Sequence, residues 1–153
     1  MKKLWRVPVL CLVGSWVAFY LTVYLGRFFF VVKTMGENGN MIVSADPVRS
    51  SIFHWVLFLL ILVVGGILFL RSMTKKEIAL SAAIISGIYL IFVLLQLYLP
   101  SFPLGVSVIL AQFQNWTWTV SNTLYQITGN LTLSTIAACF SPFLYLFFGK
   151  SKA

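Results

Sequence analysis

Residues 50–70 read SSIFHWVLFLLILVVGGILFL, an uncharged run of 21 residues between Arg49 and Arg71. About 20 apolar residues in sequence are enough for an α-helix to cross the hydrocarbon core of a bilayer. The whole chain has the same character, since 60% of its residues are hydrophobic and only 9% are charged. A typical soluble domain has about 25% charged residues, and a disordered chain has few apolar ones. We therefore expect an all-α integral membrane protein.

Other uncharged runs predict three further spans. Residues 7–26 lie between Arg6 and Arg27, and the helix is expected to continue to residue 32. From 78 to 149, 72 consecutive residues carry no formal charge, with Pro100 and Pro103 interrupting them. Because proline disfavours helix at the residue before it, this run is divided. The prediction is one membrane domain over 1–153, a four-helix bundle with spans at 7–32, 50–70, 77–99 and 131–148.

The distribution of basic residues predicts the topology. With four spans, eight of the eleven basic residues fall on the side of the two chain ends and the loop 71–76: Lys2, Lys3, Arg6, Arg71, Lys75, Lys76, Lys150 and Lys152. Only three basic residues fall on the other side, Lys33 and Arg49 in the loop 33–49 and Arg27 near that end of the first span, and the second loop there, 100–130, has none. Cytoplasmic loops are enriched in Lys and Arg, so we expect both ends inside the cell, in the plasma membrane of a bacterium. The net charge of +8 is thus a topology signal, and nucleic acid is not an expected partner.

The segment 104–130 leaves three alternatives open. Apolar residues recur in it at helical steps of three and four, at Phe113, Trp116, Val120, Leu124, Ile127 and Leu131. Amides and hydroxyls occupy the other positions, which favours an amphipathic helix at the outer membrane surface. It could instead be re-entrant, or could extend the last span outward. A complete fifth span is disfavoured because it would bury many amides and move Lys150 and Lys152 to the outer side.

Local signals predict how several elements begin and bend. Asp46-Pro47 has the sequence of an N-cap followed by a first helical residue. Thr74 and Glu77 have the spacing of a capping box. Residues 36–40 predict a turn, residues 41–43 a small strand, and Pro142 a kink in the last span.

Small residues at four-residue spacing predict where helices approach closely. Lipid is as apolar as leucine, so membrane helices pack through small residues that let backbones come together. We expect such packing at these positions: Gly14, Ala18, Thr22, Gly26, Gly65, Gly66, Ala79, Ala83 and Gly87. Packing inside one bundle is the preferred interpretation, and a homo-oligomer formed through the first span is the alternative.

Candidate binding residues cluster near the expected outer face. Arg27 ends the first span, and its alternatives are an ion pair with Glu37 or Asp46, an anionic ligand, or a simple interfacial position. Amide and aromatic side chains, Gln114 among them, could form a neutral pocket for an uncharged polar ligand, a lipid headgroup or a partner subunit. The preferred interpretation is a loop that simply rests on the bilayer. The candidate binding residues on this side are Arg27, His54, Gln96, Gln112, Asn115, Trp116 and Trp118.

Catalytic groups are scarce in the sequence. No predicted span carries an acid apart from Glu77, the capping residue at the start of the third, and one histidine with two separated cysteines predicts neither a metal site nor a cofactor. Gly105-Val106-Ser107-Val108 resembles the Gly-x-Ser-x nucleophile motif of rhomboid proteases, with His54 as the available base. Rhomboids have six core spans and a histidine in a late span, whereas His54 precedes Ser107. The resemblance covers four residues and does not favour catalysis.

These observations favour a non-enzymatic membrane protein, either a subunit of a larger assembly or an accessory or binding component. The expected partners are the bilayer and a membrane protein or a second copy of the chain. The alternative is a small transporter or channel for a neutral or weakly charged solute. An intramembrane serine hydrolase using Ser107 and His54 is the weakest of the three hypotheses.

Overall fold

The computed structural model is mostly helical, and its described part contains four helices long and apolar enough to cross a membrane. It describes residues 3–35, 40–98 and 104–150, and of residues 104–108, 110 and 111 it describes the backbone alone. The four helices run over Arg6–Phe29, Pro47–Leu70, Lys75–Tyr98 and Leu131–Phe148. They match the four predicted spans closely, so the sequence prediction of four apolar helices is confirmed.

Nine elements make up the described chain. Helix α1 (Arg6–Phe29) leads into the antiparallel hairpin β1 (Val31–Met35) and β2 (Met41–Ala45). Helix α2 (Pro47–Gly65) continues as a π-helical turn, η1 (Gly66–Leu70), and is followed by α3 (Lys75–Tyr98). Helix α4 (Leu104–Thr128) connects to α5 (Leu131–Ala138), and a 3-10 helix, η2 (Ser141–Phe148), ends the described chain.

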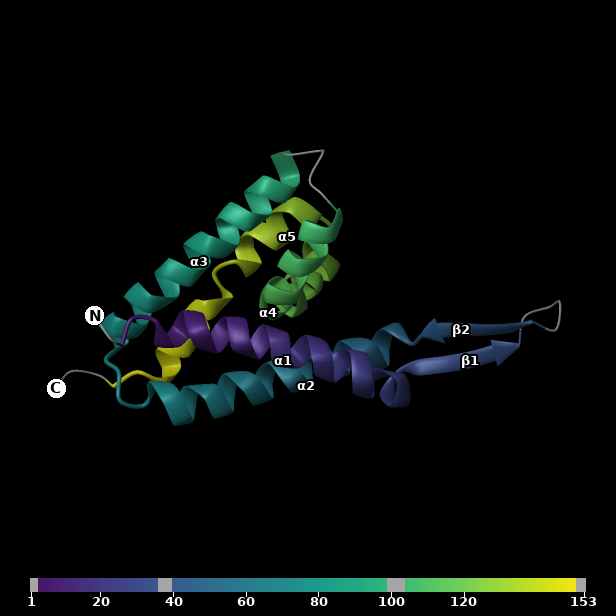
Figure 1. The fold of residues 1–153 in the computed structure, drawn as a ribbon, viewed down its shortest axis with the longest axis horizontal. Coiled ribbons are helices and arrows are strands. Elements are labelled where there is room, and N and C mark those ends of the chain that lie inside the picture. Colours follow the sequence, from purple (N-terminus) through teal and green to yellow (C-terminus); the bar gives the residue numbers. More distant parts are fainter. Residues whose placement is uncertain (1–2, 36–39, 99–103, 151–153) are drawn as a thin grey trace.

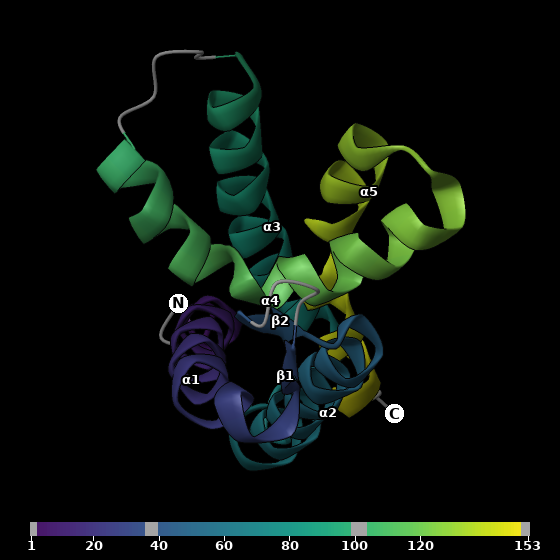
Figure 2. The same ribbon diagram turned by 90° about the vertical axis from the view of Figure 1, so that its right-hand side faces the viewer.

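The helices form two groups that diverge from one end of the molecule, with α4 between the groups. Helices α1 and α2 lie side by side, and the hairpin projects beyond their shared end (Figure 1). Helix α3 and the pair α5–η2 diverge from them, while α3 packs on α1 and η2. Figure 2 shows α4 as two arms that meet where it crosses α1, between α3 and α5.

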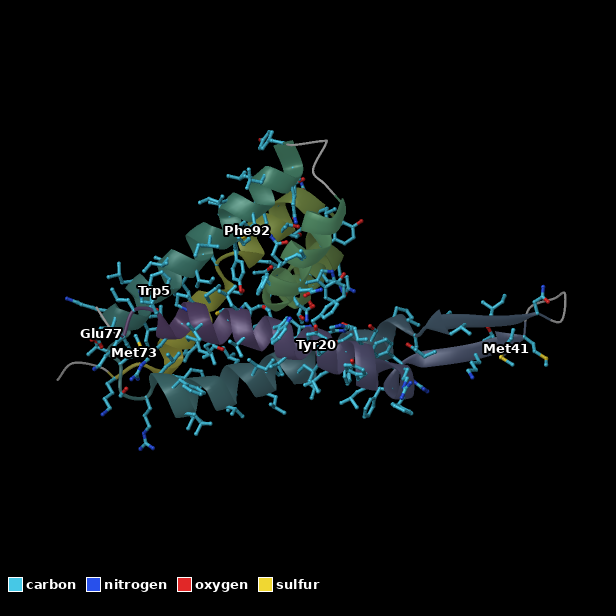
Figure 3. All side chains as sticks on the ribbon, in the orientation of Figure 1. Trp5, Tyr20, Met41, Met73, Glu77 and Phe92 are labelled. Carbon is cyan, nitrogen blue, oxygen red and sulfur yellow. The ribbon has the colours of Figure 1, made fainter. Side chains whose placement is uncertain are left out.

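Both ends of the described chain lie at the same end of the molecule, here called the terminal end. Lys150 pairs with the α2–α3 loop, because its amide donates to the Met73 carbonyl at 3.0 Å and its carbonyl accepts from the Lys75 amide at 3.2 Å. Near the other terminus, the Ser81 hydroxyl donates to the Leu4 carbonyl. Figure 3 shows Trp5, Met73 and Glu77 gathered at this end, with Met41 far away on the hairpin. A chain that crosses a membrane an even number of times has both of its ends on one side, and the observed arrangement is consistent with this.

The end of α1 corrects one predicted boundary. The first span was expected to continue to residue 32, but α1 ends at Phe29 and residues 31 and 32 begin β1. Val31 and Val32 pair with Ala45 and Ser44, and β-branched side chains favour a strand over a helix end. The small strand predicted at 41–43 is confirmed as part of β2. The predicted turn at 36–39 lies outside the described residues.

Both predicted helix caps are present. The Asp46 carboxylate accepts hydrogen bonds from the amides of Val48 and Arg49 at 2.9 and 3.1 Å, and Pro47 is the first residue of α2. The Glu77 carboxylate accepts from the Thr74 amide at 2.8 Å, and the Thr74 hydroxyl accepts from the Glu77 amide at 3.3 Å. Each cap satisfies backbone donors that have no partner within the helix.

The last span bends as expected, but the break comes before the proline. Helix α5 ends at Ala138, and the 3-10 helix begins at Ser141 with Pro142 in its first turn. Proline supplies no amide to the helical hydrogen-bond ladder, and its ring disfavours the α conformation at the residue before it, so the α-helix stops upstream.

Three of the predicted small residues are sites of close helix approach. A Cβ atom on Gly14 would lie 2.7 Å from an Ile61 methyl, and one on Gly65 would lie 2.7 Å from Leu10, so α1 and α2 approach closely at both places. A Cβ atom on Gly66 would lie 2.5 Å from the Phe148 ring. Real Cβ atoms do not approach this closely, so the neighbouring side chains occupy the space that the glycines leave.

The remaining small residues have other environments. The Phe30 ring of the same chain segment covers Gly26, while Ala18 and Thr22 are half-buried on α1. The stripe on α3 does not pack within the protein as expected, since Ala83 is exposed, Ala79 is only half-buried and nothing lies within 4 Å of a Cβ on Gly87. The buried face of α3 is a different one and carries both large and small residues: Ile78, Ser81, Ala82, Ile85, Ser86, Tyr89 and Val93.

We expect Gly66→Leu to destabilise the protein and Gly87→Leu to leave it nearly unchanged. The new side chain at 66 would overlap the Phe148 ring, and overpacking of this kind costs about 1–3 kcal/mol. At 87 the same substitution enters open space. Thermal unfolding of the two purified variants in one detergent tests the difference. Equal unfolding temperatures would show that Gly66 is not a site of tight packing.

A polar recess at the bend of α4 as the candidate functional site

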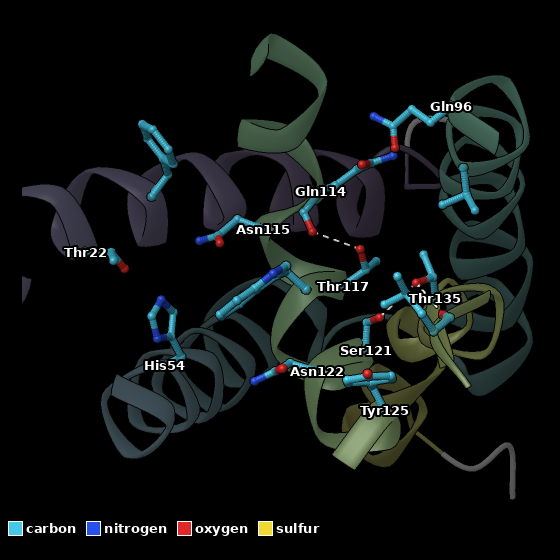
Figure 4. Close-up of a pocket in the computed structure, with 14 residues that line it drawn as sticks. Thr22, His54, Gln96, Gln114, Asn115, Thr117, Ser121, Asn122, Tyr125 and Thr135 are labelled. Carbon is cyan, nitrogen blue, oxygen red and sulfur yellow. Dashed lines mark hydrogen bonds between the residues drawn. The ribbon is translucent and has the colours of Figure 1, made fainter. Parts of the chain in front are cut away.

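A recess of about 490 Å³ lies over α4, between α1 and α2 on one side and α3 and α5 on the other (Figure 4). This volume is within the range of small-molecule sites. Most lining residues carry an amide, a hydroxyl, an imidazole or an aromatic ring, although the surface that they present to the recess is largely apolar, and none of the lining side chains is formally charged. The lining residues are Phe19, Thr22, His54, Val93, Gln96, Gln114, Asn115, Thr117, Trp118, Ser121, Asn122, Tyr125, Leu131 and Thr135.

The position of α4 is set by its contact with the middle of α1. The Trp116 amide donates a hydrogen bond of 2.9 Å to the Ser15 hydroxyl, and both residues are buried. Next to Ser15, Gly14 has no side chain, and its Cβ position lies 3.9 Å from the Trp116 indole. Ser15 is near the midpoint of α1, so α4 reaches about half-way along that helix. It does not lie across the helix ends.

Two side-chain interactions coincide with the place where the arms of α4 meet. The Ser15 hydroxyl engages the Trp116 amide, and the Thr117 hydroxyl donates to the Gln114 carbonyl at 2.8 Å. Hydroxyls that enter the helical hydrogen-bond ladder commonly bend a helix. The bend turns the polar residues on either side of it toward the recess (Figure 4).

Polar contacts also hold α4 to α2 and α5. The Trp55 indole donates to the Thr123 hydroxyl at 2.9 Å, and Thr123 donates to the Thr119 carbonyl at 3.1 Å. The hydroxyls of Ser121 and Thr135 are 3.1 Å apart, which joins α4 to α5. Together with the Ser15 contact, these bonds explain how the hydroxyl-bearing side of α4 is buried between helices.

An aromatic layer closes the recess toward the terminal end. The Trp116 ring is 4.5 Å from Phe58 and 5.4 Å from Tyr145, measured between ring centroids. Trp116 is only 2% exposed, and Tyr145 is fully buried. The recess therefore has a packed floor and does not continue through the molecule.

Two buried polar atoms of the recess have no partner in the described part of the chain. They are the Thr22 hydroxyl oxygen on α1 and the Gln114 side-chain nitrogen on α4. Buried polar groups in folded proteins are nearly always hydrogen-bonded, because an unmet donor or acceptor costs about 1–3 kcal/mol. Buried polar atoms of the packed interior also lack a partner in the described chain, among them the Trp116 indole nitrogen and the Tyr145 hydroxyl, but Thr22 and Gln114 belong to residues that line the recess.

His54 presents one ring nitrogen for a ligand. Its Nδ1 lies 2.7 Å from the Ser50 carbonyl, which can only accept, so Nδ1 carries the proton and donates. Nε2 is then an acceptor in the neutral ring and has no partner among the described residues. The ring is held by Trp118, whose centroid is 4.9 Å away, and by Phe30 at 6.1 Å.

Four of the predicted binding residues meet in the recess: His54, Gln96, Asn115 and Trp118. Trp116 belongs to the packed floor, and Gln112 does not line the recess. Arg27 is also elsewhere, with its guanidinium 4.6 Å from the Phe28 ring, while Asp46 contacts Arg49 at 3.5 Å. The expected pocket includes both Trp116 and Trp118, but residues two positions apart lie on different faces of a helix. Gln114, which the expected pocket also includes, lines the recess.

Several residues that line the recess were not predicted from the sequence. They are Phe19, Thr22, Val93, Thr117, Ser121, Asn122, Tyr125, Leu131 and Thr135. Those on α4 carry a signal that the sequence does contain, since Gln114, Thr117, Ser121 and Tyr125 follow helical steps of three and four. Thr22 and Thr135 become neighbours of α4 only in the folded bundle. The Ser107 side chain lies outside the described residues.

Comparison with protein-family profiles, curated proteins and solved structures finds no match to this chain. The fold and the site together define an uncharged recess in a bundle of four candidate membrane-spanning helices. Its function has to be argued from this geometry.

We expect Thr123→Val to destabilise the protein because it leaves the buried Trp55 indole without its acceptor. Polar contacts between membrane helices contribute about 0.6–2 kcal/mol each. Thr132→Val is the matched control, since Thr132 is exposed and makes no side-chain hydrogen bond to a described residue. Chemical unfolding followed by tryptophan fluorescence measures both variants. Equal stability of the two would contradict a structural role for the bond.

Proposed function

We propose that this protein is a non-enzymatic binding component of the cell membrane, alone or as an accessory subunit of a larger assembly. Its recess would take an uncharged ligand that both donates and accepts hydrogen bonds. The observation that carries the proposal is the pair of unpartnered polar atoms, on Thr22 and Gln114, buried at the recess. The same chemistry occurs on an uncharged lipid headgroup and on a free polar solute.

The lining explains why an uncharged ligand is favoured. An amide offers both donors and acceptors, and four amides line the recess: Gln96, Gln114, Asn115 and Asn122. A charged ligand would lose its hydration without gaining an opposite charge, which is costly in a low-dielectric site. Trp118 and Tyr125 add partly exposed rings against which an apolar ligand face can pack.

The proposed orientation places both chain ends in the cytoplasm. It is supported by the excess of basic residues at the terminal end and by the meeting of the chain ends there. In this orientation α4 is a re-entrant segment of the outer half of the membrane, and the recess is accessible from outside. A helix that carries hydroxyls and amides is tolerated at this depth because neighbouring helices surround it.

We expect a fluorescent reporter fused after Ala153 to be active in the cytoplasm. A periplasmic enzyme reporter inserted between residues 36 and 39 should be active on the other side. Both follow from four crossings with the basic loops inside. Reporter activity in whole cells checks the two fusions together, and external activity of the fusion after Ala153 would reverse the proposed orientation.

Ligand binding can be tested with glucose as an uncharged probe, presented free and as the headgroup of a glucosyl diacylglycerol. In phosphatidylcholine nanodiscs, one of these two forms should raise the unfolding temperature of the wild type. The form of glucose that raises the unfolding temperature shows whether the ligand is a free solute or a lipid headgroup. Glucosamine and glucuronate, which are similar in shape but charged, should protect less.

The matched variants are Gln114→Leu and Gln126→Leu, both on α4. Gln114 lines the recess, whereas Gln126 is exposed and does not. Loss of one well-placed hydrogen bond should weaken binding roughly tenfold in Gln114→Leu. Without probe, this variant should be as stable as the wild type or more stable, since it removes an unpaired buried amide. No protection by glucose in either form, equal protection by the charged analogues, or equal responses of the two variants would contradict the proposal.

A small transporter of neutral solutes is the alternative. The observation in its favour is the set of buried hydroxyls that α4 brings half-way along α1, on Thr117, Thr119 and Ser121. A transport path would have to open the aromatic layer of Phe58, Trp116 and Tyr145. Uptake of labelled glucose by proteoliposomes, abolished in Gln96→Leu, would favour transport over binding alone.

A further inference from the structure

A second cavity lies on the outer surface of the bundle at the terminal end, away from the recess. It is an apolar groove of about 290 Å³ along the first turns of α1 and beside η1. Its lining residues are Trp5, Arg6, Val9, Leu10, Val13 and Phe69. Apart from Arg6 at one end, the walls are hydrocarbon and aromatic side chains, so the groove suits an extended aliphatic chain.

Two positively charged side chains, Arg6 and Lys3, lie at one end of this groove. Arg6 Nη1 donates to the Phe69 carbonyl at 3.0 Å and to the Ser72 hydroxyl at 2.8 Å. Lys3 Nζ donates to the Ser72 carbonyl at 3.4 Å. Both side chains therefore converge on Ser72, and within the described ranges neither forms an ion pair.

The two cations keep donors for an anion. In the described structure, Arg6 uses only Nη1, which leaves Nε and Nη2 available, and Lys3 uses one of its three N–H donors. The bonds to residues 69 and 72 fix where the charges lie relative to the groove. Trp5 is beside them, 62% exposed, and an indole at this level is typical of the membrane interface.

We propose that this groove binds one anionic phospholipid, with an acyl chain between α1 and η1 and the phosphate at Lys3 and Arg6. The apolar groove and the cation pair match the two parts of such a lipid in their natural order along the membrane normal. A zwitterionic lipid carries the same phosphate, but its own cation would face two further cations. The charge complementarity therefore selects a lipid of net negative charge.

The π-helical turn explains how the groove forms. Residues Gly66–Leu70 continue α2 with a wider turn, and Phe69 of this turn forms one wall. The Arg6 guanidinium binds a carbonyl that the end of the helix leaves free, as cations commonly do at helix C-termini. Single π-helical turns occur frequently at binding sites.

The test is native mass spectrometry of the full chain released from nanodiscs of equimolar phosphatidylglycerol and phosphatidylcholine with identical acyl chains. The wild type should retain one phosphatidylglycerol in preference to phosphatidylcholine. Lys3→Gln should lower this preference about fivefold, the effect of one basic residue at a membrane surface. Lys76→Gln removes an equally exposed charge at the same end but away from the groove, and should leave the preference unchanged.

A second pair of variants tests the acyl chain. Val9→Trp fills the groove and should abolish retention of the lipid, as should Val13→Trp. Val23→Trp is the control, because Val23 lies on the same helix and is 56% exposed, close to the 54% of Val9, but is not in the groove. All these sites are exposed, so the variants should fold, and unfolding temperatures equal to that of the wild type would verify it.

Three results would overturn the proposal. Equal retention of the two lipids by the wild type would remove the selectivity for negative charge. Equal losses in Lys3→Gln and Lys76→Gln would show a diffuse attraction to the basic end and no defined site. Unchanged retention in both groove variants would show that no acyl chain lies between α1 and η1.

Discussion

The hydrogen bond from the Trp116 amide to the Ser15 hydroxyl fixes how far α4 enters the bundle, and the rest of the site depends on that depth. The indole of Trp116 lies 3.9 Å from the Cβ position of Gly14, at ordinary contact distance from α1, and between the rings of Phe58 and Tyr145. The aromatic floor then separates the packed half of the bundle from the half that holds the recess. One polar contact between α1 and α4 thus places both the floor and the cavity above it.

A polar helix between apolar ones is stable only if its neighbours satisfy its hydrogen bonds. The contacts Trp55–Thr123 and Ser121–Thr135 do so for the second arm of α4, and Ser15 does so at the bend. Thr22 and Gln114 are exceptions at the recess. The Trp116 indole nitrogen and the Tyr145 hydroxyl in the aromatic floor also lack a partner among the described residues, so an unmet hydrogen bond alone does not mark a ligand site. What distinguishes Thr22 and Gln114 is that both residues line the recess.

The sequence was sufficient to predict the elements that depend on local chemistry. Long uncharged runs predicted four apolar helices, and Asp46, Thr74 and Pro142 predicted two caps and a bend. Boundaries failed where pairing between distant residues decided the conformation, as for Val31 and Val32, which join Ala45 and Ser44 in the hairpin. Spacing alone was also insufficient for Gly87. Its stripe of small residues has the expected four-residue spacing, but in the folded chain a Cβ atom at this position would face open space.

For the recess, the sequence predicted the chemistry better than the geometry. It indicated a neutral site of amides and aromatic rings, and His54, Gln96, Asn115 and Trp118 do line one. It could not show that α4 bends, because the bend involves Ser15, which is 101 positions away from Trp116. The recess and the groove at the terminal end are separate, because α4 lines the first and contributes no described residue to the second. Coupling between two sites requires an element that both of them contact and that has two arrangements. Among the described residues the two sites share α1 and the continuous helix of α2 and η1, which provides His54 to the recess and Phe69 to the groove. These two helices pack closely against each other at Gly14 and Gly65. A lipid in the groove would therefore anchor this pair of helices without changing the shape of the recess.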